Sequence, residues 1–287
     1  MKTLWNKEQE IDFFTSSLNV TTPEKLFYQS NNNKFIAYWP KDYKGEKSTL
    51  QSRNAFIGDY TEKWCGGLLK DFAKKINAHI VQDVICEEIE LTRQSPADVA
   101  LCKTKDTIQK PEDILLIFEV KMSVVWNWEL KKENLICLGD YSTHKGTPGL
   151  LRSDTMLKAI GKSINIRISD YKAAKIPIII LGNTPIQNSY YGKVDHLKKC
   201  GIIQGFWSVN PKPLENDDTL KNTKAFGFHR FDSYDTLEKE LDKLLKEDRE
   251  FFSSMQTKGE LGRIIEIANK ETSYEKKAEK FLELIRK

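Results

Sequence analysis

Apolar residues recur at helical spacing in two segments of the chain. Residues 60–77 carry them three or four positions apart, at Trp64, Leu68, Leu69, Phe72 and Ile76. A second segment begins at Ser153 or Asp154, which are both good N-cap residues, and carries Met156, Leu157, Ile160, Ile164 and Ile168. The spacing predicts two amphipathic helices, each with these apolar side chains facing a core.

The segments around these helices have the pattern of strands. Residues 80–91 and 98–101 are extended segments on either side of the breaker Ser95-Pro96, and they are predicted to be two antiparallel strands. Residues 114–118 and 178–181 are continuous apolar runs, which are typical of strands in the middle of a sheet. The predicted order is helix, three strands, helix, strand, in an α/β protein.

The two ends of the chain have other patterns. Residues 1–58 are predicted to be an irregular N-terminal extension, because clusters of turn-forming residues separate short apolar segments. Residues 59–186 form the predicted core domain. Residues 187–287 are expected to be part of the same domain, first as mixed loop and strand and then, from Tyr234, as three helices broken near Thr257 and Glu271.

Composition excludes several classes of protein. Of the 287 residues, 39% are hydrophobic and 30% are charged, which is usual for a globular chain and not for a disordered one. The longest apolar run is too short to span a bilayer, and the N-terminus does not resemble a signal peptide. Five scattered cysteines without a CxxC pair indicate neither a disulfide framework nor a zinc site. We therefore expect a soluble, cytoplasmic protein that does not contact membranes.

Basic residues are unevenly distributed along the chain. Lys and Arg exceed Asp and Glu by 45 to 41 overall, but by ten to five between Lys121 and Lys175. From Asp232 to the end, twelve basic residues stand against fourteen acidic ones. A local basic excess is typical of a phosphate-binding cleft, and a solvated face is the alternative.

The candidate chemistry lies at the ends of two predicted strands. Asp98 begins one strand, and Glu119 and Lys121 end the next. In adjacent antiparallel strands the beginning of one lies beside the end of the other, so both carboxylates can approach one cation. Residues two apart in a strand share a face, which puts Lys121 beside Glu119 and turns Val120 to the core. Two hard oxygen ligands favour Mg²⁺. Together with Lys121, they predict a site that hydrolyses phosphodiesters.

Context separates this Glu-x-Lys pattern from two others in the chain. Glu129-Leu130-Lys131 lies in a polar stretch and Glu275-Lys276-Lys277 in a helical one, whereas Glu119 follows five apolar residues. The alternative interpretation is an ion pair between Glu119 and Lys121 at a strand end.

Two segments, Ser95-Pro96-Ala97-Asp98 and Ile117-Phe118-Glu119-Val120-Lys121, resemble the PD-(D/E)XK nuclease superfamily, although the proline stands one place earlier than usual. The resemblance covers residues 59–186 and, together with Arg152-Ser153-Asp154-Thr155-Met156-Leu157-Lys158-Ala159, looks most like type II restriction endonucleases. It implies a restriction-endonuclease-like fold, with a mixed central sheet flanked by helices in the order αβββαβ, and a helical C-terminal region follows this core.

The same resemblance implies roles for individual residues. Asp98 and Glu119 would hold the metal with the main-chain carbonyl of Val120, and Lys121 would be catalytic. Many members add a glutamate from the first helix, for which Glu62 is the candidate, with a solvated glutamate as the alternative.

Further basic residues are candidates for DNA contacts. His144 and Lys145 lie in a loop before the second helix, and Arg152, Lys158 and Lys162 are spaced along one side of it. A solvent-exposed basic stripe is the alternative for these residues.

The function expected from these features is that of a Mg²⁺-dependent type II restriction endonuclease acting on double-stranded DNA. A palindromic target implies a homodimer. The alternatives are another nuclease of the same fold, such as a resolvase or repair nuclease, and a non-catalytic DNA-binding protein.

Overall fold

The computed structural model describes residues 2–30, 32–45, 49–216, 219–247, 249–252 and 256–286. It divides into two compact units, Met1–Asp248 and Arg249–Lys287, which are described separately here.

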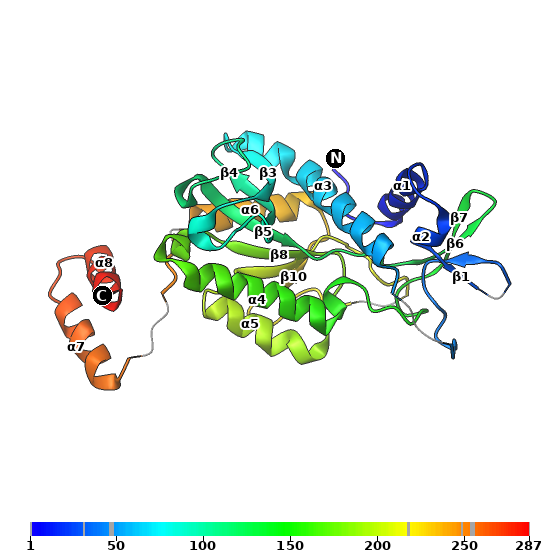
Figure 1. Cartoon of the computed structure of the whole chain (residues 1–287). Coiled ribbons are helices and arrows are strands. Elements are labelled where there is room, and N and C mark those ends of the chain that lie inside the picture. Colours follow the sequence, from blue (N-terminus) through cyan, green and yellow to red (C-terminus); the bar gives the residue numbers. More distant parts are fainter. Residues whose placement is uncertain are drawn as a thin grey trace. The chain divides into compact units, whose positions relative to one another are not determined.

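A six-stranded mixed sheet organises the first unit (Figure 1). The sheet and its helices comprise α3 (Gln51–Lys75), β3 (His79–Val84), β4 (Ala97–Cys102), β5 (Ile114–Val120), α4 (Ser153–Ser169), β8 (Ile178–Gly182), α5 (Tyr191–Lys199), β9 (Gly205–Ser208), β10 (Phe228–Arg230) and α6 (Tyr234–Lys246). The strand order is β10-β9-β8-β5-β4-β3, in which β3, β4 and β5 are antiparallel and β5, β8, β9 and β10 are parallel. The continuous apolar strands β5 and β8 lie at its centre, as their sequences predict.

Side chains that alternate along each strand build two separate cores. Val99 and Leu101 of β4 join a core with α3 and α6, whereas Ala100 and Cys102 join another with α4 and α5. The sheet therefore has helices on both faces, as Figure 1 shows. The predicted first helix is confirmed, although it begins nine residues before Tyr60, at Gln51.

The buried face of α4 differs from the prediction. Its buried side chains are Met156, Ala159, Ser163, Ile166 and Arg167. Leu157, Ile164 and Ile168 were expected in the core, but they are 62%, 36% and 66% exposed. The small side chains of Ala159 and Ser163 face the sheet instead, and the Ser163 hydroxyl donates to the Ala159 carbonyl (2.8 Å).

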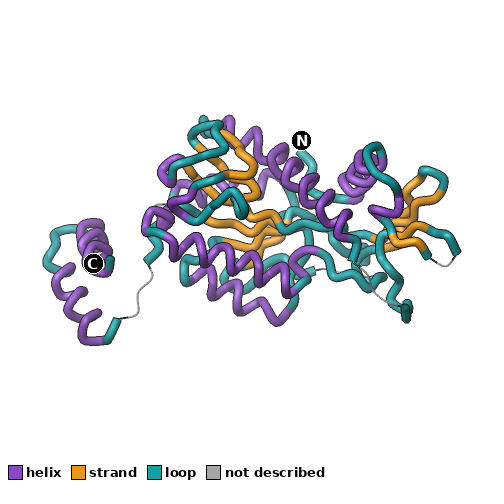
Figure 2. The backbone as a smooth tube through the Cα atoms, in the orientation of Figure 1, coloured by secondary structure: helices purple, strands orange, loops and turns teal. Residues whose placement is uncertain are grey.

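The N-terminal 58 residues are more regular than predicted. They contain α1 (Lys7–Leu18), α2 (Pro23–Leu26), β1 (Tyr28–Gln29), β2 (Phe35–Ile36) and the start of α3. The connection between β5 and α4 contains a hairpin that the sequence did not predict, made of β6 (Asn127–Lys131) and β7 (Asn134–Gly139). Together β1, β2, β6 and β7 form a four-stranded antiparallel sheet, drawn at the right of Figure 2.

A buried carboxyl group joins the N-terminal segment to the chain that follows β5. Glu10 of α1 accepts hydrogen bonds from the main-chain N–H groups of Val125 and Trp126 (2.5 and 3.2 Å) and from the indole of Trp128 (2.8 Å). Burial raises the pKa of Glu10 to about 7, and these donors act in the opposite direction. The aromatic side chains of Trp126, Trp128 and Trp207 are buried.

The second unit contains α7 (Lys258–Ala268) and α8 (Tyr274–Ile285). Thr257 and Ser273 cap these helices by accepting main-chain N–H hydrogen bonds from Glu260 and Lys276 (3.2 Å each). With α6, they confirm the three helices and both breaks predicted after Tyr234. Within the described residues, no helix is both long and apolar enough to cross a membrane.

Candidate functional site

Strands β4 and β5 bring Asp98 and Glu119 together. Val99 pairs with Phe118 in the antiparallel ladder, so Asp98 and Glu119 lie opposite each other one position further along. The main-chain N–H of Val120 donates to Asp98 Oδ2 (2.7 Å), which holds this carboxylate against the end of β5. The predicted convergence of the two carboxylates is confirmed.

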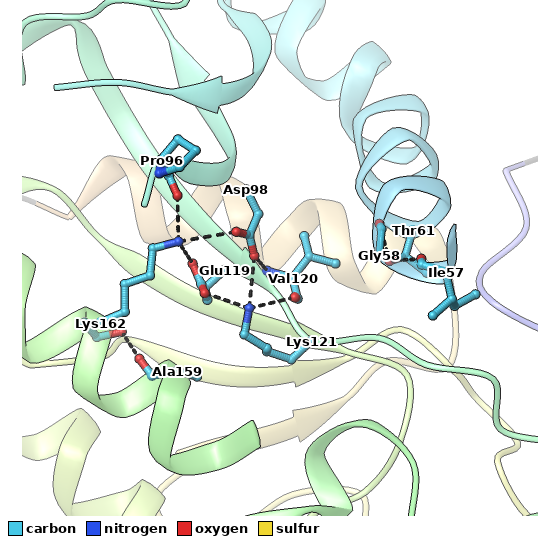
Figure 3. Close-up of polar contacts among 11 residues, drawn as sticks. Ile57, Gly58, Thr61, Pro96, Asp98, Glu119, Val120, Lys121, Ala159 and Lys162 are labelled. Carbon is cyan, nitrogen blue, oxygen red and sulfur yellow. Dashed lines mark hydrogen bonds and ion pairs between the residues drawn. The ribbon is translucent and has the colours of Figure 1, made fainter. Parts of the chain in front are cut away.

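Glu119 and Lys121 point to the α4 side of the sheet. Phe118 and Val120 belong to the core with α3, so their neighbour Glu119 faces the other way. The ammonium of Lys121 lies 2.6 Å from Glu119 Oε1 and 3.1 Å from Asp98 Oδ2, and it also donates to the carbonyl of Val120 (3.0 Å). The predicted shared face of Glu119 and Lys121 is confirmed (Figure 3).

A second lysine, Lys162 of α4, completes the cluster. Its ammonium lies 2.6 Å from Glu119 Oε2 and 3.3 Å from Asp98 Oδ1, and it donates to the carbonyl of Pro96 (2.6 Å). Figure 3 shows Lys121 and Lys162 on opposite sides of the two carboxylates. The sequence placed Lys162 in a basic stripe for DNA, whereas the structure places it among the candidate catalytic residues.

The four side chains form a balanced and mostly buried group of charges. The side chains of Asp98 and Glu119 are 16% and 7% exposed, and those of Lys121 and Lys162 are 20% and 19% exposed. Burial disfavours the charge of Lys121, but the carboxylates of Glu119 and Asp98 outweigh it and raise the pKa of Lys121. Lys121 therefore stays protonated and acts as a donor of hydrogen bonds and charge.

Glu62 approaches the site from α3, on the opposite face of the sheet. Burial, followed by the negative charges of Asp98, Asp83 and Asp59, raises the pKa of this carboxyl group to about 7, against a smaller lowering by Lys121. Within the described residues, Glu62 has no hydrogen bond or ion pair with Asp98, Glu119 or Lys121. It lies within electrostatic reach of the cluster without being held by it.

Glu62 makes the stability of the protein depend on pH. Its pKa in the folded state lies above the ordinary value of 4.5, so the stability it contributes is lost as the pH rises from about 4.5 to about 7. The variant Glu62→Gln stays neutral and should lose less stability across this range. Urea unfolding of both proteins between pH 5 and pH 8 measures the difference, because Glu10 contributes equally to both. Identical pH dependence would contradict this account of Glu62.

The donor atoms of the cluster fit a hard divalent cation. The carboxylates of Asp98 and Glu119 and the carbonyl of Val120 are oxygen ligands of the kind that Mg²⁺ takes from proteins. Within the described chain, Glu119 Oε2 is buried and accepts no hydrogen bond, and its contact is the ion pair with Lys162. No group of three or more His, Cys, Asp and Glu side chains is arranged for a metal in that part of the chain. A cation here would therefore rely on two carboxylates, with the lysine ammoniums as its competitors.

The residues predicted to contact DNA have different environments. His144 was expected on the surface, and this is wrong: it is 2% exposed, it stacks on Tyr38, and its Nε2 lies 3.1 Å from the carbonyl of Val125. Burial lowers the pKa of His144 to about 4, so this ring carries no charge for a phosphate at neutral pH.

The other three candidates are more accessible. Lys158 is exposed, Arg152 is exposed and paired with Asp154 (2.8 Å), and Lys145 is half-buried and donates to the carbonyl of Tyr43.

Comparison of the chain with protein-family models, with curated proteins and with solved structures gave no match.

Proposed function

We propose that the protein is a Mg²⁺-dependent deoxyribonuclease of the type II restriction class, with a PD-(D/E)XK active site. The observation that supports this most strongly is the cluster itself: Asp98, Glu119 and Lys121 meet at the adjoining ends of β4 and β5. The order α3-β3-β4-β5-α4-β8 supports it as well, because it is the element order of that superfamily's core.

Asp98, Glu119 and the carbonyl of Val120 would hold the metal ion. When bound, Mg²⁺ would lower the pKa of a water molecule and neutralise charge that develops on the phosphate. Glu119 is restrained on both carboxylate oxygens, by Lys121 and by Lys162, each at 2.6 Å. These ion pairs fix the position of the Glu119 carboxylate in the metal-free protein, and a metal ion would displace an ammonium in order to bind it.

The two lysines provide positive charge for the substrate. Lys121 is protonated, so it would donate to a phosphate oxygen or orient the attacking water and would not abstract a proton. Lys162 contacts the same carboxylates from α4, and it would also donate to a phosphate oxygen or orient the attacking water. The reaction would be a hydrolysis, in which water attacks phosphorus and loses a proton to solvent, the P–O ester bond breaks and the leaving oxygen takes a proton from solvent.

The proposed partner is double-stranded DNA, and the proposed assembly is a homodimer. Cutting both strands of a palindromic site requires two active sites related by two-fold symmetry, which one chain does not supply.

The pattern of DNA cleavage tests the proposal against its alternatives. Long natural DNA incubated with the protein and Mg²⁺ should give discrete fragments. A smear, or cutting confined to branched or damaged DNA, would favour another nuclease of the same fold. Intact DNA across a range of Mg²⁺ and Mn²⁺ concentrations would contradict catalysis and favour a DNA-binding protein.

A further inference from the structure

A cavity of about 280 Å³ is lined in part by residues that lie close in the chain to the cluster. Ser123 is one of its lining residues and follows Lys121 by two positions, so their Cα atoms are within about 7 Å of each other. Arg152 lines it from the start of α4, the helix that carries Lys162.

Aromatic rings form one part of the cavity wall. Tyr28, Tyr38 and Trp39 line it, and Trp39 packs between Tyr43 on one side (centroids 3.9 Å apart, planes 6° apart) and Tyr28 on the other (5.3 Å, 31°). The indole N–H of Trp39 is buried and has no hydrogen-bond acceptor among the described residues. A buried donor without an acceptor is costly, so a movement of this stack that brings an acceptor to it, from the protein or from a ligand in the cavity, is favoured.

Cations form another part of the wall. Arg53, Lys145 and Arg152 line the cavity, and none of its described lining residues is acidic. Arg53 is 4% exposed, and its guanidinium lies 4.6 Å from the centroid of Tyr38 and donates to the carbonyl of Leu26 (3.3 Å). The position of this charge is therefore set before any ligand arrives. Asp154, outside the lining, offsets part of the charge of Arg152.

Size and chemistry together restrict the ligand. The volume is near the lower limit for small-ligand pockets, so it suits one ring system and excludes a segment of duplex. Aromatic and guanidinium planes attract a second flat π-system, and the cations attract its phosphate. A free inorganic anion would use the cations but not the aromatic wall.

We propose that this cavity binds a single unstacked nucleobase of the DNA substrate, with Arg152 and Lys145 at its flanking phosphate. The proposal rests on the proposed function for its choice of DNA as the source of the base. Proteins that take a base out of the stack read it in pockets of this kind, with ring contacts and hydrogen bonds to its edge. Asn54, Thr49 and Ser123 supply neutral donors and acceptors for such an edge.

Nucleotide titration of the full-length, metal-free protein tests the proposal without requiring cleavage. The probes are the four deoxynucleoside monophosphates, deoxyribose 5-phosphate and inorganic phosphate, and the readout is the NMR signal of the Trp39 indole N–H, assigned with Trp39→Phe. At least one nucleotide should shift this signal saturably, whereas the two probes without a base should not. Absence of a shift, or an equal shift with inorganic phosphate, would overturn the proposal.

Two variants that each remove a surface cation test the cation wall. Arg152→Ala should weaken nucleotide binding by about tenfold, as expected for a lost hydrogen bond to a charged group, and Lys243→Ala, which removes an exposed lysine of α6, should not. Equal binding by both variants would overturn the role of Arg152. If the protein binds nucleotides but cuts no DNA, the proposed function is wrong and the proposed role of the cavity stands. If it cuts DNA but binds no nucleotide, the proposed role of the cavity is wrong and the proposed function stands.

Discussion

Replacing Glu119 by glutamine, or Asp98 by asparagine, should slow Mg²⁺-dependent DNA cleavage by about a thousandfold or more. Each change removes a charged ligand of the proposed metal ion while leaving the side-chain volume unchanged. Metal ions contribute several kcal/mol of transition-state stabilisation, and each 1.36 kcal/mol is a factor of ten in rate. The measurement is the initial rate of cleavage of a DNA that the wild-type protein cuts, with circular dichroism to confirm that the variants fold.

Two other Glu-x-Lys motifs in the chain supply matched controls. Glu129 lies on β6 and pairs with Lys34 (3.3 Å), and Glu275 lies in the first turn of α8. Glu129→Gln and Glu275→Gln should cleave at close to the wild-type rate, because neither residue is part of the cluster. A Glu119→Gln protein as active as these controls would contradict the assignment of Glu119.

Replacing either lysine of the cluster by methionine should have the second largest effect on cleavage, about a hundredfold for each. This is the usual cost of removing one donor that stabilises charge in a transition state. Lys243→Met is the control, since Lys243 is an exposed lysine of α6 outside the cluster and outside the candidate DNA contacts. A Lys162→Met variant with the wild-type rate would place Lys162 outside the chemistry.

Mg²⁺ should also change the free energy of unfolding of the Lys162→Met variant. In metal-free protein, Lys162→Met leaves Glu119 Oε2 without its cationic partner, and the cost to the free energy of unfolding should be about 1–3 kcal/mol. Because a bound Mg²⁺ replaces the missing charge, adding it should stabilise Lys162→Met more than the wild type. Urea unfolding with EDTA and with Mg²⁺ measures this difference.

The paired carboxylates were predictable from the sequence because their positions depend on local patterns. A run of five apolar residues before Glu119 marks a central strand, and Asp98 begins the strand preceding it. Two-residue alternation then determines the faces of Glu119 and Val120 without any knowledge of long-range contacts.

The role of Lys162 was not predictable in the same way, because hydropathy pointed to the wrong face of α4. The larger apolar residues Leu157 and Ile168 are exposed, while Ser163 and Arg167 are buried. Arg167 tolerates burial because its guanidinium donates to the carbonyl of Ile202 (3.1 Å) and to Gln204 (2.9 Å). If Ala159 and Ser163 are taken as the buried face of α4, the neighbouring Lys162 is predicted to point toward the sheet.

The hairpin of β6 and β7 was missed because its turn lacks the usual residues. Lys132 and Glu133 both have positive φ angles, of 46° and 68°, which Asn-Gly or Gly-Gly pairs normally occupy in two-residue hairpins. Its tertiary support is also non-local: Glu10 accepts hydrogen bonds from Val125 and Trp126, more than a hundred residues later. No pattern within the first 58 residues indicates that contact.

Mn²⁺ binding reports whether Asp98 and Glu119 together hold a divalent cation. Electron paramagnetic resonance measures the concentration of free Mn²⁺ as the ion is titrated into metal-free protein. The proteins compared are the wild type, Asp98→Asn and Glu129→Gln, and the measurement reports binding whether or not DNA is cut. We predict saturable binding by the wild type and by Glu129→Gln, and its loss in Asp98→Asn. Binding that is unchanged in Asp98→Asn, or absent from the wild type, would contradict the account.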